Sequence, residues 1–315
     1  MPDISVIVTT HNRARLLERC LSSILAQTDV ELEVIVVDDA SSDDTPTVVV
    51  KLLADPRLRY HRLERNCGAP ARPRNIGIAQ AQSPLLFIFD SDDTMLPGCL
   101  RAFVSAFEAE PELGLAWSRK NVLNREGATV EIEKRDRLMT EPPFPLALSY
   151  APGANGLAIR RSVVEAIGGF DEAMPRMDDY EITLRFLADG RWRLRVLDEV
   201  TMNVHSDSND HVSASEKRTL AAREHVLAKH HALFARYPEV HARHLYQLAL
   251  LRLRVHRDRA GFLRGLLASL RSDPRRVRRA LTLWRLLPGA LPRARAGARS
   301  DSTKRVHLKR NVVDD

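Results

Sequence analysis

Residues 85–93 have the sequence LLFIFDSDD, in which five apolar residues run directly into Asp90, Ser91, Asp92 and Asp93. A short, uninterrupted apolar run of this kind is typical of a strand that is buried on both faces of a parallel sheet. In such sheets, ligands bind beyond the carboxyl ends of the strands. The stretch therefore predicts an α/β fold with a binding site directly after this strand.

The same unit, an apolar run followed by a polar turn and a helical segment, precedes this stretch three times. Apolar runs predict strands at residues 4–9, 32–37 and 58–63. Helical spacing of the intervening apolar side chains predicts helices at residues 14–26, 44–53, 70–81 and 97–108, with Asn12 as the cap of the first. Strands that alternate with helices define βαβ units, so we expect a mostly parallel sheet flanked by helices.

Beyond residue 110 the pattern is mixed, and it then becomes helical. Short apolar runs predict strands at residues 113–119, 129–134, 155–160 and 193–197, and helices at 161–167 and 178–188. From residue 216 to 287 helical spacing continues, with expected breaks at Pro238 and Pro274. We therefore divide the chain into a first part (1–215), a helical C-terminal extension (216–290) and an Arg-, Ala-, Gly- and Ser-rich tail (291–315) that we expect to be disordered.

The composition of the 315-residue chain is that of a globular protein. Hydrophobic residues make up 44% and charged residues 28%, which excludes global disorder and fibrous or disulfide-rich scaffolds. No apolar run reaches the ~18 residues of a membrane span, and the N-terminus lacks the basic and apolar regions of a secretion signal. The three cysteines, Cys20, Cys67 and Cys99, lack metal-binding spacing. A cytoplasmic protein with reduced thiols is the expectation.

The net charge of +7 is divided unequally along the chain. Residues 216–315 carry 24 Lys and Arg against eight Asp and Glu, a net charge of +16, whereas residues 1–215 carry 24 against 33, a net charge of −9. In the basic part, apolar side chains at helical spacing (262–270 and 281–287, with Trp284) are interspersed with arginines. Such helices suit the surface of an anionic membrane, and equally a helical bundle packed on the first part of the chain. No nucleic-acid-binding module accompanies the charge, so no nucleic-acid partner is expected.

Two acidic clusters and one arginine at predicted strand and helix ends can carry chemistry. Asp90 and Asp92 occupy alternate positions of one short loop, and their hard oxygen ligands suit Mg²⁺ or Mn²⁺ bound to a diphosphate. Of Asp38 and Asp39, one is expected to accept from a ribose hydroxyl or a base N–H and the other to cap the next helix. Arg74 begins the third helix, where it can bind an anion. The position of Asp90 and Asp92 directly after an apolar strand favours ligand binding over a solvated turn, whereas Arg74 taken alone would be interpreted as a surface arginine.

Four motifs follow one another in the first 93 residues: TTHNR (9–13), VVDDAS (36–41), NCG with RNIG (66–77) and FDSDD (89–93). Together they resemble the nucleotide-sugar half of the family 2 inverting glycosyltransferases, which have the A-type glycosyltransferase fold. Further matches follow at GGFDE (168–172), DDYEITLR (178–185) and His205. The resemblance spans residues 3–215. It implies one catalytic domain with a nucleotide-sugar-binding part (1–110) and an acceptor part (111–215).

The resemblance implies a role for each matching residue. On the donor side, Thr9, His11, Arg13 and Asp39 would border the nucleobase and ribose, Arg74 the base or diphosphate, and Asp90 the ribose or a metal-bound water. Asp92 and His205, with Asp90, would hold Mn²⁺ or Mg²⁺. Asp179 would be the general base that deprotonates the acceptor hydroxyl, and a helix N-terminus suits an ionised carboxylate. Asp178, which replaces the usual glutamate of the family, is the second candidate.

Two other features have a simpler expectation. Four histidines lie on the basic helical part, and we expect them to be surface residues: His230, His231, His241 and His244. Residues 138–156 contain four prolines and are expected to shape acceptor specificity without adding recognisable chemistry.

The resemblance implies metal-dependent, inverting transfer of a sugar from a nucleotide-diphosphate sugar, with a UDP-sugar as the expected donor. The acceptor would be a hydroxyl of a glycan, a lipid-linked molecule or a small molecule, in cell-surface polysaccharide, glycolipid or secondary-metabolite synthesis. The enzyme would be cytoplasmic or peripheral on the cytoplasmic face of the membrane. The alternative is an inactive nucleotide-sugar-binding or scaffold protein of the same fold, which the joint presence of the acidic residues and His205 disfavours. A processive membrane-embedded synthase is not expected, because membrane spans are lacking.

Overall fold

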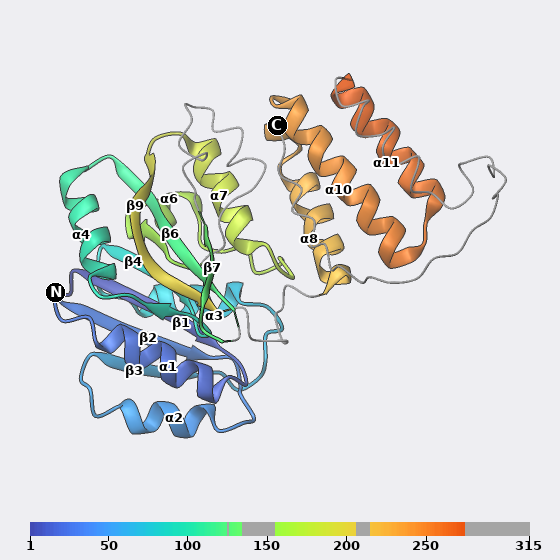
Figure 1. The fold of residues 1–315 in the computed structure, drawn as a ribbon. Helices are drawn as coiled ribbons and strands as arrows, with labels where there is room; N and C mark the ends of the chain where they lie inside the picture. Colours follow the sequence, from blue (N-terminus) through green and yellow to red (C-terminus); the bar gives the residue numbers. More distant parts are fainter. Residues whose placement is uncertain (125, 134–154, 206–214, 275–315) are drawn as a thin grey trace, which may run out of the picture. The chain divides into compact units, whose positions relative to one another are not determined.

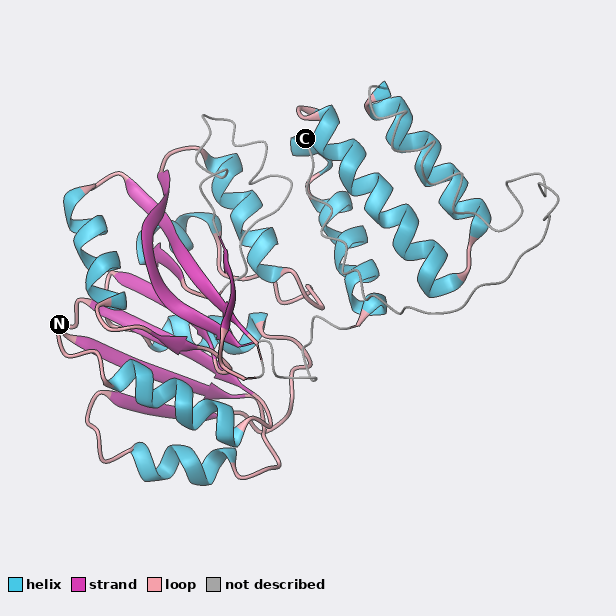
Figure 2. Ribbon diagram, viewed as in Figure 1, coloured by secondary structure: helices cyan, strands magenta, loops and turns pink. Residues whose placement is uncertain are grey.

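The structure is a computed structural model that describes residues 1–124, 126–133, 155–205 and 215–274. Within these residues the chain forms a nine-stranded sheet in the order β3-β2-β1-β4-β8-β6-β9-β5, with β7 also paired to β6. Helices cover both faces of the sheet (Figures 1 and 2). The expected tail, the apolar run at 281–287 and nearly all of the proline-containing segment lie outside the described residues.

The first half of the sheet is parallel, as predicted. Its strands are β1 (Ile4–Thr10), β2 (Leu32–Asp38), β3 (Leu58–Arg62) and β4 (Leu85–Asp90). β1 lies between β2 and β4, and the register sets Thr10 opposite Asp38 and Thr9 opposite Asp90. The carboxyl ends of these three strands therefore lie side by side at one edge of the sheet, which is where an α/β sheet binds its ligands.

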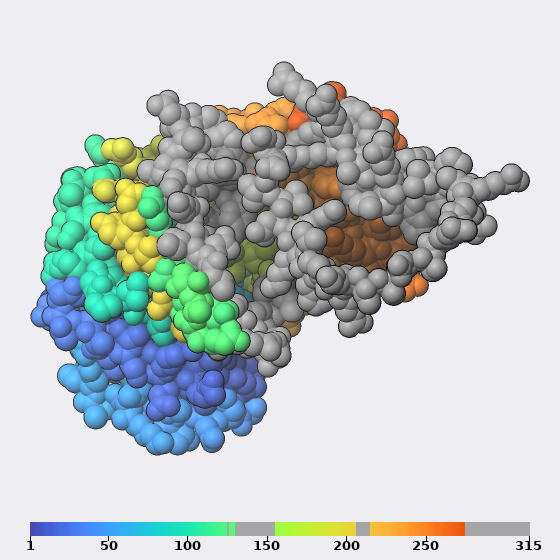
Figure 3. Space-filling view, viewed as in Figure 1, coloured from blue at the N-terminus to red at the C-terminus, as the bar shows by residue number. Residues whose placement is uncertain are grey.

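The second half of the sheet is mixed. β6 (Leu113–Leu123) is antiparallel to β8 (Leu157–Arg160) and parallel to β9 (Arg193–His205), and β8 is antiparallel to β4. Two short strands, β5 (Thr94–Met95) and β7 (Thr129–Glu133), pair antiparallel with β9 and β6. In the space-filling view β9 (yellow) lies beside α4 and the β6–β7 region (turquoise to green), although these segments are far apart in the sequence (Figure 3).

One strand runs through two stretches, 193–197 and 200–204, that each have the pattern of a strand. The strand expected at 193–197 continues to His205, because Leu197 lies opposite Ser118 while Val200 lies opposite the next residue of β6. The two polar residues between them, Asp198 and Glu199, form a bulge, and a bulge interrupts an apolar pattern without ending a strand. The bulged strand carries His205 to the end of β5.

Two helical layers cover the sheet. One face of the sheet forms a hydrophobic core cluster with three helices: α1 (Ala14–Leu25), α2 (Thr45–Leu52) and α4 (Cys99–Ala109). The opposite face forms a second cluster with three others: α3 (Ala71–Gln80), α6 (Arg161–Ile167) and α7 (Asp178–Asp189). Successive strand residues alternate between the clusters, as with Val6 and Ile7. A Cβ at Gly77 of α3 would lie 2.5 Å from Cγ2 of Ile7. The lack of a side chain at Gly77 thus lets α3 lie directly on β1, with Arg74 at the strand ends.

The C-terminal extension is helical, as predicted, and the described part of it consists of α8 (Glu216–Lys229), α9 (His231–Ala235), α10 (Pro238–His256) and α11 (Arg259–Ser272). Pro238 begins α10, but a further break that was not predicted separates α10 from α11. At this break Arg257 has a positive φ of 53°, and the Asp258 carboxylate caps α11 by accepting from the Gly261 amide at 2.7 Å. A capped turn without proline leaves no strong signal in helical spacing.

The extension packs on α7 of the first part. A third core cluster joins Tyr180 and Leu184 of α7 to Val226 of α8, Phe234 of α9 and Val240 of α10. α11 packs in turn on α10, where Ser269 Oγ donates to the carbonyl oxygen of Ala242 at 2.7 Å. Helices α8 to α10 therefore pack on the first part of the chain, as expected from the second of the two interpretations of the basic C-terminal part. None of the described helices combines the length and apolar character needed to cross a bilayer.

Candidate active site

The ends of β1 and β2 form the first part of the site. Here the neighbouring residues Asp38 and Asp39 make different contacts. Asp38 is fully buried and accepts from Tyr60 Oη at 2.6 Å and from the Ser41 amide at 2.8 Å, so it fixes the turn after β2. The Asp39 carboxylate accepts from the Cys67 amide at 2.7 Å. It therefore fastens the NCG loop to the strand end, and His11 Nδ1 donates to its carbonyl oxygen at 2.8 Å.

Asn12 does not cap α1, so that prediction is wrong. Its φ is +52°, and its Oδ1 accepts from the Ser42 amide at 2.7 Å. The free amides at the start of α1 find their acceptors in the loop after β2 instead, as the Ala14 amide does at Asp43 Oδ2, 3.2 Å away. A long-range partner has taken the place of the local cap, and the result is that the loops after β1 and β2 are tied together.

The acidic loop after β4 forms the second part of the site. Asp92 Oδ2 lies 2.6 Å from Arg13 Nη1 in an ion pair that is largely buried. Asp93 is buried beneath it and accepts from the His205 amide at 2.9 Å and from Asn155 Nδ2. Burial raises the pKa of Asp93 well above its usual range, and the negative charges of Asp92 and Asp90 raise it further. The loop thus concentrates negative charge at the strand end.

Arg74 connects this loop to the start of α7. Its Nη2 lies 3.1 Å from Asp90 Oδ1, its Nη1 lies 2.5 Å from Asp178 Oδ2, and its guanidinium lies 5.4 Å from the centre of the Phe170 ring. Burial alone would lower the pKa of Arg74, but the carboxylates of Asp178, Asp90 and Asp179 outweigh it and raise the pKa. The positive charge is therefore retained in a buried position between the two halves of the sheet.

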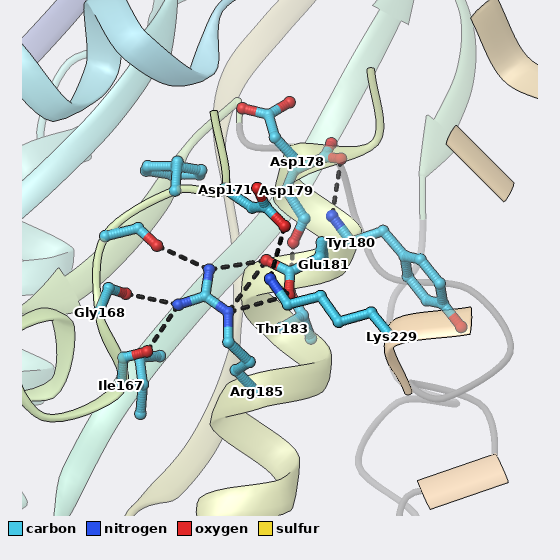
Figure 4. Close-up of polar contacts among 12 residues, drawn as sticks. Ile167, Gly168, Asp171, Asp178, Asp179, Tyr180, Glu181, Thr183, Arg185 and Lys229 are labelled. Carbon is cyan, nitrogen blue, oxygen red and sulfur yellow. Dashed lines mark hydrogen bonds and ion pairs between the residues drawn. The ribbon is translucent and has the colours of Figure 1, made fainter. Parts of the chain in front are cut away.

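The two candidate bases at the start of α7 have different surroundings. The Asp178 side chain is 4% exposed and is held by Arg74, whereas Asp179 is half-buried. Asp179 Oδ1 accepts from the Tyr180 amide at 2.7 Å, and Thr183 Oγ1 donates to the Asp179 carbonyl oxygen at 2.7 Å. Figure 4 shows Asp178 and Asp179 side by side where α7 begins. Because α7 begins there, its dipole stabilises both carboxylates in the ionised form.

A buried ionic cluster beneath these residues was not predicted. Glu181 is fully buried and receives Arg185 Nη2 at 2.7 Å, Lys229 Nζ at 2.9 Å and His230 Nε2 at 3.0 Å. Burial raises the pKa of Glu181, but the hydrogen bonds from His230, Arg185 and Lys229 outweigh this and lower it to about 2. Figure 4 shows the Arg185 guanidinium between Glu181 and the carbonyl oxygens of the loop from Ile167. The cluster thus fixes the loop before α7.

Two histidines of the extension are buried, so the expectation that they are surface residues is wrong. His230 is 8% exposed and bonds to Glu181, and His244 is 1% exposed and lies with Nε2 2.8 Å from Tyr180 Oη. The carboxylate that holds His230 lies 49 residues away in the sequence. Histidine spacing on a helix could not reveal these partners, because both belong to α7.

The GGFDE motif is also explained by contacts across the fold. Asn75 of α3 accepts from the Phe170 amide at 2.7 Å and donates to the Phe170 carbonyl oxygen at 2.9 Å. A Cβ at Gly169 would lie 2.5 Å from Asn75 Oδ1, so the loop approaches α3 closely only because this residue is glycine. Asp171 is held in turn by Lys229 Nζ at 2.5 Å.

The structure thus brings most of the expected site residues to one edge of the sheet. Arg74, Asp90 and Asp178 form one ion-paired group, and Arg13 and Asp92 form another. His205 lies beside the acidic loop, with its Nε2 3.2 Å from Thr94 Oγ1, and Thr9 is half-buried opposite Asp90. His11 is exposed next to Asp39.

The carboxylates of the acidic loop fit a divalent cation that takes further ligands from its substrate. No three His, Cys, Asp or Glu side chains of the described ranges are arranged around one possible metal position. Mg²⁺ and Mn²⁺ in diphosphate sites, however, are held by one or two carboxylates together with phosphate oxygens and water. Asp92 and Asp90 carry such hard oxygen atoms, and after burial their negative charges are the next cause of the raised pKa of Asp93.

Comparison with known proteins assigns the family. The family model described as "Glycosyl transferase family 2" matches residues 5–167, just over half of the chain. The chain therefore belongs to glycosyl transferase family 2, as its motifs indicated.

Two curated relatives each match somewhat less than half of the chain. The succinoglycan biosynthesis protein ExoO of Rhizobium meliloti is 35% identical over 146 residues, which are 46% of this chain and 41% of the relative. The GalNAc(5)-diNAcBac-PP-undecaprenol beta-1,3-glucosyltransferase of Campylobacter jejuni is 36% identical over 155 residues, 45% of this chain and 49% of the relative. The chain thus spans less than half the length of these relatives.

Solved structures match over most of the chain and support the A-type glycosyltransferase fold. The 1–349 fragment of Staphylococcus aureus TarS in complex with UDP-GlcNAc has a TM-score of 0.60 and 20% identity, over 86% of this chain and 91% of that one. The mannosyltransferase PcManGT of Pyrobaculum calidifontis, in complex with GDP-Man and Mn²⁺, has a TM-score of 0.54 and 21% identity, over 90% and 79%. At these identities the likeness concerns the fold alone.

Proposed function

We propose that this protein transfers a sugar from a nucleotide-diphosphate sugar to an acceptor hydroxyl, with inversion at the anomeric carbon. The observation that carries the proposal is the buried guanidinium of Arg74, which joins Asp90 of the donor loop to Asp178 at the start of α7. A donor bound at the strand ends would therefore have its sugar directed toward the carboxylates of α7. The membership of glycosyl transferase family 2 supports the same chemistry.

The donor would lie along the ends of β1, β2 and β4. The nucleobase and ribose would be bordered by Thr9, His11, Arg13 and Asp39. These residues lie at the ends of β1 and β2, where His11 bonds to Asp39 and Asp39 bonds to the NCG loop. Arg74 would act mainly by positioning Asp90, because its guanidinium is already engaged by two carboxylates. We favour a UDP-sugar, the class of donor bound in the TarS complex, over a GDP-sugar, the class bound in the PcManGT complex.

Asp179 is the better candidate for the general base. An inverting transfer needs a carboxylate that accepts the proton of the acceptor hydroxyl as this oxygen attacks the anomeric carbon. Asp178 is buried and paired with Arg74, so protonating it would leave a buried positive charge with one partner fewer. Asp179 is half-buried, and α7 stabilises its ionised form.

A divalent cation, Mn²⁺ or Mg²⁺, would be held by Asp92 and Asp90, with His205 as a further ligand. Such an ion offsets the negative charge that develops on the departing diphosphate. Arg13 would supply part of the same compensation, since its guanidinium already lies at Asp92.

The acceptor is proposed to belong to cell-surface carbohydrate or secondary metabolism. The relatives are named for succinoglycan biosynthesis and for transfer to an undecaprenol-linked saccharide, so a glycan or lipid-linked acceptor is favoured over a small molecule. A place in the cytoplasm, at times peripheral on the membrane, would suit a lipid-linked acceptor. On α11 the apolar side chains of Leu263 and Leu267 are 43% and 53% exposed, with exposed arginines beside them, which supports contact with an anionic surface.

The proposal is tested by titrating UDP and GDP into the full-length protein with and without Mn²⁺, followed by a donor hydrolysis assay. We expect binding of one nucleoside diphosphate that is strengthened by Mn²⁺, and slow release of that diphosphate from the matching nucleotide sugar. Absence of nucleotide binding would refute the proposal. Binding without hydrolysis or transfer for any nucleotide sugar would favour the inactive, nucleotide-sugar-binding alternative.

A further inference from the structure

Three arginines from three separate elements gather beside the proposed base. Arg176 precedes α7, Arg223 lies on α8, and Arg243 lies on α10, and all three are half-buried. Arg176 Nη1 donates to Thr219 Oγ1, one helical turn before Arg223. The charge of Asp179 acts on Arg176, and the charges of Arg176 and Arg243 both act on Arg223. Arg176 therefore lies near Asp179, and Arg176 and Arg243 both lie near Arg223.

Arg223 is the centre of this group, and its hydrogen bonds do not neutralise its charge. Its Nη1 lies 2.7 Å from His244 Nδ1, and His244 Nε2 lies 2.8 Å from Tyr180 Oη. Because a guanidinium only donates, Nδ1 must accept, so His244 is uncharged and carries its proton on Nε2. No carboxylate among the described residues pairs with Arg223, and its Nε is buried without a hydrogen-bond partner.

A cation in this position is unfavourable in the protein by itself. Burial lowers the pKa of Arg223, and the positive charges of Arg176 and Arg243 lower it further. Buried charges are normally paired, and like charges that are held together repel each other. An anion bound among the three guanidinium groups would supply the charged partner that Arg223 lacks among the described residues.

We propose that Arg176, Arg223 and Arg243 bind a phosphate group carried by the acceptor, an inference that rests on the proposed function. Several guanidinium groups suit phosphate in particular, because their planar N–H pairs match its oxygens. With the phosphate held here, a hydroxyl elsewhere on the acceptor would be presented to Asp179. Such positioning makes the attack effectively intramolecular. The acceptor class is thus a phosphate-bearing glycan, polyol or lipid carrier.

The test measures phosphate binding apart from donor chemistry. Inorganic phosphate is titrated calorimetrically into full-length protein that has been saturated with UDP and Mg²⁺. We expect Arg223→Gln and Arg243→Gln to weaken phosphate binding about 10- to 100-fold, as expected for loss of a charge-assisted hydrogen bond. The matched control is Arg236→Gln, an exposed arginine at the end of α9, which should leave phosphate affinity unchanged. UDP affinity should be the same in all four proteins.

Two further arms identify the source of the phosphate. Glycerol 3-phosphate represents a soluble polyol phosphate, and phosphatidylcholine vesicles with and without phosphatidic acid represent a lipid carrier. If the protein binds one of these two probes more tightly than inorganic phosphate, and Arg223→Gln loses this binding, the result supports the proposal and identifies the source of the phosphate.

Two results would overturn the proposal: wild-type protein that binds UDP but no phosphate probe, or equal losses in Arg223→Gln and Arg236→Gln. If Arg223→Gln does not fold, the phosphate affinity of Arg243→Gln is compared with that of Arg236→Gln instead. Failure of wild-type protein to bind UDP would refute the proposed function instead, and phosphate binding would then be measured without UDP.

Discussion

Arg13 and Asp92 form an ion pair of 2.6 Å across the site, although one residue precedes the first helix and the other follows the fourth strand. The pair is held from both sides, since the carbonyl oxygen of Asp92 also accepts from Arg19 Nη2 at 2.7 Å. The guanidinium of Arg13 is thus bound to the same carboxylate that we propose as a metal ligand. A divalent cation at Asp92 must compete with Arg13.

This competition gives the first prediction, for Arg13→Gln. Removing the positive charge should strengthen the binding of Mn²⁺ alone by about 10-fold, since a unit charge at this distance near a protein surface is worth at least ~1 kcal/mol. The free Mn²⁺ signal in electron paramagnetic resonance measures the affinity. Arg15→Gln, a change at an exposed arginine in the first turn of α1, is the control. Equal or weaker Mn²⁺ binding in Arg13→Gln would contradict the competition.

Asp92→Asn should remove the dependence of donor binding on the metal. Asparagine keeps the size of the side chain but loses the charge that attracts a hard cation. Titration of Mn²⁺ against UDP affinity provides the measurement, and a melting curve checks that the fold is retained. If Mn²⁺ strengthens UDP binding as much as in the wild type, Asp92 is not a ligand.

The third prediction separates the two aspartates of α7. Asp179→Asn should keep nucleotide binding and stability but lose transfer by ~10²–10⁴-fold, the usual contribution of a positioned general base. Asp178→Asn should instead lower the free energy of unfolding by roughly 3–5 kcal/mol, because buried Arg74 loses a charged partner. Transfer rates and urea unfolding of both variants provide the data. Near wild-type transfer in Asp179→Asn would move the base elsewhere, first to Asp178.

The buried carboxylate of Glu181 should make stability depend on pH. Its pKa is lowered to about 2 in the folded protein, below the ordinary value of the unfolded chain, 4.5. The ionised form therefore adds stability on the order of 3 kcal/mol above pH ~4.5, and this is lost as the pH falls toward 2. Urea unfolding of Glu181→Gln and wild type should differ strongly at pH 7 and converge in acid.

The control for that series is Glu224→Gln. Glu224 pairs with Arg252 at 2.7 Å on the surface, where its side chain is 44% exposed. Exposed ion pairs contribute little to stability, so its unfolding curve should follow that of the wild type at every pH. A pH-independent difference between Glu181→Gln and the wild type would show that lost packing, rather than charge, causes the destabilisation.

The last prediction concerns the basic C-terminal part. If it contacts an anionic membrane, each Lys or Arg near the surface contributes ~1 kcal/mol, and salt screens the attraction. Co-sedimentation with anionic vesicles should then be strong at low salt and weak at high salt. Removal of residues 274–315 should weaken binding to vesicles without lowering UDP affinity, because the core shared by α7 to α10 remains. Full-length protein that stays in solution with anionic vesicles at low salt would exclude the membrane contact.

Local sequence was sufficient wherever an element is defined by its own periodicity. The apolar runs that end at Asp38 and Asp90 predicted parallel strands, and the register places their ends side by side. Motifs likewise singled out candidate site residues that lie at strand ends or begin a helix: Asp39, Asp90, Asp92 and the two aspartates of α7. Their roles stay predictions.

The tertiary structure alone decided which charges meet. Sequence spacing could not show that Arg74 would be buried between Asp90 and Asp178, or that Arg13 would lie at Asp92. It could not show that His230 bonds to Glu181, 49 residues away. The physical reason is that periodicity reports which face of an element is buried, whereas an ion pair depends on how separate elements pack against one another. The roles proposed for Asp178 and Asp179 draw on the same distinction, since these two adjacent carboxylates differ in their burial and in their partners.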